Sequence, residues 1–91
     1  MISSALPGAE LVEQGLADLR EQRESIASLL VSVGAARLAA AGYDVVQPFD
    51  DAEHRLYELL SRSDPDSAHS RYNALIRSLV SFERAAECVV P

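Results

Sequence analysis

Apolar residues recur at helical spacing in three stretches of the chain, and the clearest stretch lies toward the C-terminus. From residue 68 onward they alternate at steps of four and three, as in a helix that packs against another helix. Asp64 and Pro65 suit the N-cap and the first turn, so we predict a helix over residues 65–89. Its apolar seam consists of Ala68, Tyr72, Leu75, Leu79, Phe82, Ala86 and Val89.

A second apolar pattern runs from residue 9 to residue 41 without a proline or a turn cluster, and it predicts one long first helix. A wholly polar segment, residues 20–25, divides its apolar stripe into two halves. Two glycines within it, Gly15 and Gly34, are either tolerated defects or points where another helix approaches closely.

A third, shorter pattern predicts a helix over residues 51–62. Before it, Gly42 fits the left-handed residue that ends a helix, and residues 42–49 read as an extended connector. Asp50 is expected to cap the helix, with Glu53 completing a capping box. The expected buried stripe consists of Ala52, Leu56, Leu59 and Leu60, with Tyr57 at its edge.

These patterns predict an all-α chain of three helices, long, short and long, in a single domain that spans residues 1–91. A chain of 91 residues buries only about 60–65% of the surface that its unfolded form exposes. We therefore expect the helical bundle to be completed by association, as a homodimer or with a helical protein partner. The residues expected at this interface are Val12, Leu16, Leu19, Ile26, Leu30, Val33, Ile76 and Val80.

Charge and composition limit the classes of partner that we expect and indicate a cellular compartment. The formal net charge is −6, which disfavours phosphate backbones and anionic lipid surfaces, so we expect neither a nucleic-acid nor a membrane partner. No apolar run approaches the ~18 residues that a membrane span requires. Cys88 is the single cysteine, and residues 1–7 lack the features of a secretory signal. We expect a cytoplasmic protein.

The two histidines are the first candidates for metal chemistry. His54 follows Asp51 by three residues, and His69 follows Asp66 by three. Paired acid and histidine at this spacing hold di-iron in some helical bundles. Acids in a first helical turn are also favoured by the helix dipole alone, so we predict no metal and no cofactor.

Arg23 and Arg37 interrupt the apolar seam of the long first helix, where a bundle usually places leucine. Each arginine has three possible roles. It lies along the interface with its guanidinium in water, it pairs with an acid of a neighbouring helix, Glu83 and Glu87 being the candidates, or it binds a small anion.

The third role connects to a family resemblance. The stretch Leu16-Ala17-Asp18-Leu19-Arg20-Glu21 is similar to the Leu-Arg motif in helix one of AroQ-type chorismate mutases, and Arg37 follows Arg20 by seventeen residues, as the family's next substrate-binding arginine does. The resemblance implies that Arg20 and Arg37 grip the carboxylates of a dicarboxylic substrate. It does not extend to the lysine and helix-three glutamine positions, because the chain has no lysine and no glutamine beyond residue 47.

The sequence thus supports two functional hypotheses. The leading one is a small cytosolic interaction or regulatory protein that acts by helix-to-helix docking. The alternative is a small-molecule enzyme of the mutase type with an arginine-lined anion site.

Overall fold

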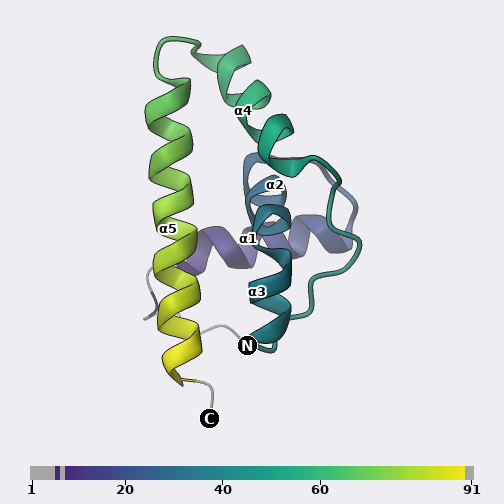
Figure 1. Ribbon diagram of the computed structural model, residues 1–91. Coiled ribbons are helices and arrows are strands. Elements are labelled where there is room, and N and C mark those ends of the chain that lie inside the picture. Colours follow the sequence, from purple (N-terminus) through teal and green to yellow (C-terminus); the bar gives the residue numbers. More distant parts are fainter. Residues whose placement is uncertain (1–5, 7, 90–91) are drawn as a thin grey trace.

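The computed structural model describes residue 6 and residues 8–89, and these form five α-helices, which confirms the all-α prediction (Figure 1). Within this described part no strand is present. The fold is elongated, with extents of 41 × 24 × 19 Å. The helices are α1 (Ala9–Arg20), α2 (Ile26–Val33), α3 (Ala35–Ala40), α4 (Ala52–Ser63) and α5 (Ala68–Val89). The predicted domain spans residues 1–91, and its residues 1–5, Pro7, Val90 and Pro91 lie outside the part that the structure describes.

The prediction of one long helix over residues 9–41 is wrong, because the chain breaks twice within it. The first break is the polar segment. Gln22 takes a left-handed conformation with φ 54°, and the N–H of Arg23 donates to the carbonyl of Asp18 at 2.8 Å. Ser25 then caps α2, since its Oγ accepts from the N–H of Ser28 at 3.0 Å and its own N–H donates to Ser28 Oγ at 2.7 Å.

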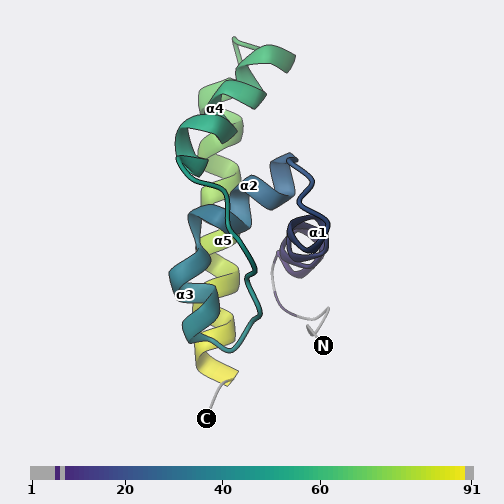
Figure 2. The same ribbon diagram turned by 90° about the vertical axis from the view of Figure 1, so that its right-hand side faces the viewer.

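This break lets α2 fold back against α1, so that both halves of the apolar stripe face each other inside one chain. Figure 2 shows α1 end-on, lying across the direction of α5 rather than along it. Gly15 permits the close approach, because a Cβ there would lie 2.3 Å from the backbone oxygen of Ala27. Of the two predicted alternatives for Gly15, a tolerated defect or a point of close helix approach, the structure shows the close approach.

The second break lies at Gly34, which joins α2 to α3 with φ −94° and ψ 15°. The chain bends here, since α2 runs obliquely to α5 and α3 then turns to lie beside the C-terminal half of α5 (Figure 2). Helix α4 lies beside the N-terminal half of α5 (Figure 1). The predicted three-helix count is therefore replaced by five helices, because the first predicted helix is three separate ones.

The connector and the last two helices follow the prediction more closely. Gly42 has φ 99°, as expected for a left-handed helix end. The N-cap of α4 is Asp51, which is left-handed and makes no side-chain cap bond, so the predicted capping box at Asp50 is wrong. Helix α5 begins at Ala68, three residues later than predicted.

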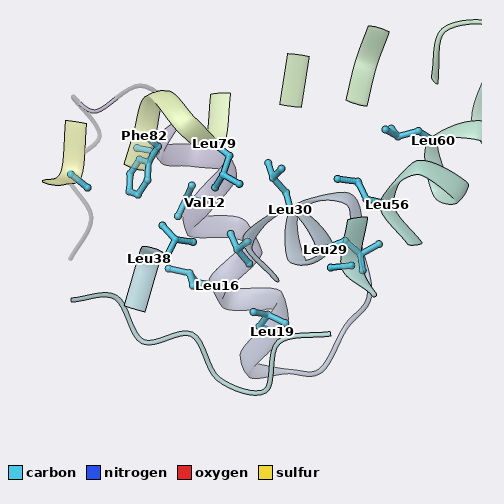
Figure 3. Packing of buried hydrophobic residues seen from close by; sticks show 14 of the residues in the cluster. Val12, Leu16, Leu19, Leu29, Leu30, Leu38, Leu56, Leu60, Leu79 and Phe82 are labelled. Carbon is cyan, nitrogen blue, oxygen red and sulfur yellow. The ribbon is translucent and has the colours of Figure 1, made fainter. Parts of the chain in front are cut away.

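The core lies where α1, α2, α4 and α5 meet, and Figure 3 shows its side chains converging from these helices and from Leu38 of α3. The α5 seam is confirmed where it is described, since Leu79 and Phe82 are buried while Tyr72 and Leu75 are partly buried against the core. The side chain of Val89 lies outside the described part. The largest fully buried side chains include Val12, Leu19, Leu29, Leu30, Val31, Leu38, Leu56, Leu60 and Phe82.

Candidate docking groove

The structure divides the eight residues expected at an interface into two sets. The first set is covered by the chain itself, with exposures between 0% and 6%: Val12, Leu16, Leu19 and Leu30. Because α2 packs on α1, these four side chains are core residues and are closed to a partner in this fold. The second set is only partly buried and consists of Ile26, Val33, Ile76 and Val80.

Three of the partly exposed residues, Val33, Ile76 and Val80, meet in one place. They line an apolar groove between the α2–α3 junction and α5, with a cavity of about 180 Å³. We call it the α3–α5 groove. Its lining residues are Val33, Gly34, Ala36 and Arg37 on one side and Ile76, Leu79, Val80 and Glu83 on the other.

Gly34 sets the width of the groove. A Cβ at this position would lie 2.6 Å from Oε2 of Glu83 and 3.0 Å from Cδ2 of Leu79. The missing side chain therefore allows α5 to approach the α2–α3 junction. The sequence predicts Val33, Ile76 and Val80 at an interface but not Ala36. Alanine is common on both exposed and buried helix faces, so its position in the sequence does not indicate an interface.

The groove ends in a small charged cluster. Arg37 pairs with Oε1 of Glu83 through its Nη1 at 3.4 Å and with Glu87 through its Nη2. Glu83 is 3% exposed, and this burial raises the pKa of its carboxyl, while the nearby Arg37 charge lowers it. The hydrogen bond to Glu87 raises the pKa of Arg37. One guanidinium thus faces two carboxylates.

Of the three roles open to Arg37, the structure shows pairing with Glu83 and Glu87, the two acids proposed from the sequence. Arg23 pairs within its own turn, with Glu21 at 3.2 Å and with Asp18 at 3.7 Å. Arg20 lies exposed in the last turn of α1. The arginines of the anion-site hypothesis, Arg20 and Arg37, therefore stand on separate helices, and carboxylates of the chain itself already contact Arg37.

The outward surface of α5 next to the groove carries arginines of a different kind. Arg77 and Arg84 are exposed, and neither forms an ion pair with any residue that the structure describes. They are seven residues apart, so they lie on the same face of the helix. Asn73 shares this side and contacts Nε2 of His69 at 3.2 Å.

The histidines are engaged locally. Nε2 of His54 lies 3.1 Å from Glu58, one turn later on α4, and His69 contacts Asn73 on α5. Across residue 6 and residues 8–89, no group of three or more acidic, histidine or cysteine side chains is arranged to hold a metal ion.

None of the helices in the described residues combines the length and the apolar character that crossing a bilayer requires. No family model, curated protein or solved structure matches this chain.

Proposed function

We propose that this protein is a small interaction protein that binds a helix of another protein molecule in the α3–α5 groove. The observation that supports it is the contrast between a closed core and an open groove. Core side chains such as Leu30 and Phe82 are fully covered, while Val33, Ile76 and Val80 stay partly exposed around one cavity. Clustered apolar exposure with a polar border is typical of binding surfaces.

The form of the groove favours a helix as its occupant. On α5, Ile76, Val80 and Glu83 follow each other at steps of four and three, so they form one row along the helix. A second helix packs by setting its own row of side chains into such a groove. An apolar row with charges beside it is also how helix-in-groove partners are recognised.

The mutase-type activity stays a prediction from the sequence. It needs guanidinium groups that can accept the carboxylates of a substrate. Arg37 already contacts Glu83 and Glu87, so no observation favours an anion site there. As the place of action we propose the cytosol, since Cys88 is exposed and unbridged, and such a thiol persists in a reducing compartment.

Site-specific photo-crosslinking tests the proposed function. A photoreactive amino acid replaces Val80 in the groove or, as a matched control, Ser70, an exposed residue of the same helix. The chain is expressed in cells, and adducts are sequenced by mass spectrometry. We expect adducts from position 80 but not from position 70, and the crosslinked peptide should carry apolar residues three and four apart.

The same design defines the contrary result. Equal adducts from both positions, or none from position 80, would overturn the proposed function. A second variant, Val33→Asp, places a charge in the groove from the opposite wall and should abolish the adducts of position 80, while circular dichroism verifies that the helices remain.

A further inference from the structure

We infer that the helix bound in the α3–α5 groove is α5 of a second copy of this chain, running antiparallel about a two-fold axis near Val80. The inference rests on the proposed function and specifies its partner. It follows from the placement of charge around the groove, from the charge distribution along the chain and from the geometry of helix pairs.

The charged cluster at the end of the groove is incomplete by itself. Arg37 balances one of two carboxylates, so Glu83, Glu87 and Arg37 together carry one excess negative charge when both acids are ionised. Glu83 is buried there, and a buried carboxylate gains from each additional positive partner. A matching occupant would therefore bring a positively charged side chain to Glu83 and a row of apolar side chains to the rest of the groove.

Helix α5 itself offers that combination. Arg77 is exposed and without an ion-pair partner among the described residues, and it lies three residues before Val80. In an antiparallel pair centred on Val80, a residue three positions before the centre faces the residue three positions after it. Arg77 of one copy thus faces Glu83 of the other, and Glu87 is one turn further along.

The same arrangement places the other residues of this face, including Arg84, which lies opposite Ile76 of the second copy because these positions are four after and four before the centre. Val80 meets Val80 of the second copy, and Asn73, seven positions before the centre, faces Glu87, seven positions after it. A parallel pair would instead set Arg77 against Arg77 and Glu87 against Glu87, which is repulsive. Closed dimers use one surface on both copies, and this surface is complementary to itself only in the antiparallel direction.

The charge of the whole chain also favours α5 as the point of contact. Helix α5 carries three arginines and two glutamates, whereas the rest of the chain carries five arginines and twelve acidic residues. Two acidic molecules repel each other on average. They meet with the least repulsion through the segment that carries an excess of arginine.

The first test measures the molecular mass in solution and the dissociation constant of the dimer for charge-reversed variants. Sedimentation equilibrium should show a species of twice the 9.8 kDa chain mass, and Val80→Asp should make the protein monomeric. Arg77→Glu should raise the Kd of the dimer by about tenfold or more, since it sets like charges together. The double variant Arg77→Glu with Glu83→Gln should recover part of the lost association, because the introduced acid then no longer faces a carboxylate. Arg71→Glu, the same charge change on an exposed residue outside the groove, should leave the Kd unchanged.

The single native cysteine gives the second test. Cys88 is exposed, so a nitroxide label on it reports the distance between two copies by pulsed electron resonance. Antiparallel pairing about Val80 offsets the two Cys88 positions by sixteen residues, or about 24 Å along the helix at 1.5 Å per residue. A parallel pair brings the labels side by side instead and permits a disulfide.

The outcomes separate the inference from the proposed function. A chain that stays monomeric up to about 1 mM, a dimer insensitive to Val80→Asp and Arg77→Glu, or adjacent Cys88 labels would each overturn the inference. If position 80 then still crosslinks to a helix of a different protein, the proposed function stands with another occupant. If position 80 crosslinks no more than position 70, both fall.

Discussion

Two places where helices meet in this molecule are each built around a glycine, yet they differ in what surrounds it. At the α1–α2 contact, a Cβ on Gly15 would collide with the backbone oxygen of Ala27 at 2.3 Å. At the α3–α5 groove, a Cβ on Gly34 would meet the end of the Glu83 side chain at 2.6 Å. Backbone cannot move aside, whereas a carboxylate can turn away. The first contact is a fixed part of the core, and the second is an adjustable surface.

The two places also differ in how they treat a buried acid. Asp18, in the α1–α2 contact, accepts hydrogen bonds from Ser25 Oγ at 2.7 Å and from Gln14 Nε2 at 2.9 Å. Glu83, in the groove, has a single ion pair with the described residues, to Arg37 at 3.4 Å. Both carboxylate oxygens of Asp18 accept a hydrogen bond inside the chain, whereas the binding that we propose for the groove would give Glu83 a second cationic partner.

Of the variants that compare the α1–α2 contact with the α3–α5 groove, Gly15→Ala should lower the free energy of unfolding the most. The new methyl group forces α1 away from α2, and such overpacking costs about 1–3 kcal/mol, more than the ~1 kcal/mol that alanine returns through helix propensity. Urea denaturation measures the loss. Gly34→Ala is the matched variant and should change the free energy of unfolding by less than about 1 kcal/mol, because only side-chain ends must shift. Equal losses would remove the distinction between fixed and adjustable contacts.

A second, comparable effect is expected from Asp18→Ala. The substitution leaves Ser25 and Gln14 without their acceptor and should lower the free energy of unfolding by about 1–3 kcal/mol. Glu21→Ala, which removes an exposed acid that also pairs with Arg23, is the control and should stay within about 0.5 kcal/mol. If Asp18→Ala proves as mild as Glu21→Ala in urea denaturation, the buried network does not stabilise the break between α1 and α2.

The smallest effect concerns Glu83 and pH. Burial raises the pKa of Glu83 in the folded chain, so the folded state binds this proton more tightly than the unfolded state. This contribution is complete below the ordinary glutamate pKa of about 4.3 and is lost as pH rises through the raised value. Glu83→Gln should therefore flatten the fall of stability over that interval, with a change at neutral pH within about 1 kcal/mol.

The measurement is the urea midpoint of both proteins at successive pH values. Glu87→Gln, which removes the exposed partner of the same arginine, controls for the loss of an ion pair. Parallel profiles for Glu83→Gln and the unmodified chain would show that the groove does not penalise the charge of this carboxyl.

The sequence allowed the last two helices to be predicted because their burial follows one uninterrupted period. Leu79 and Phe82 belong to the predicted apolar seam of residues 65–89, Leu56 and Leu60 belong to the predicted stripe of residues 51–62, and all four are buried. The pairing of Arg37 with Glu83 and Glu87 was also among the expected roles. The seam position of Arg37 and the acids near the end of α5 identified this pair as one of three alternatives, and only the structure selects it.

The break in the first predicted helix could not be read from periodicity. Leu19 and Ile26, on either side of the polar segment, are seven residues apart, which is the spacing of one helix face, so the local pattern alone favours one helix. Folding α2 back onto α1 buries both halves of the stripe, and this gain outweighs the helical turns that are lost. The local sign was the capping chemistry of Ser25 and Ser28 together with Asp18. The groove, which depends on Gly34 between α2 and α3, could be predicted only in part for the same reason.

The turn at residues 21–25 has a consequence for how the chain reaches its native state. It joins two helices whose contacts are close in sequence, and contacts at short separation form quickly because little chain entropy is lost in closing them. We expect α1 and α2 to assemble first on the folding pathway. Helix α5, which follows α4 in the chain, would then dock onto the α1–α2 pair after that pair has formed.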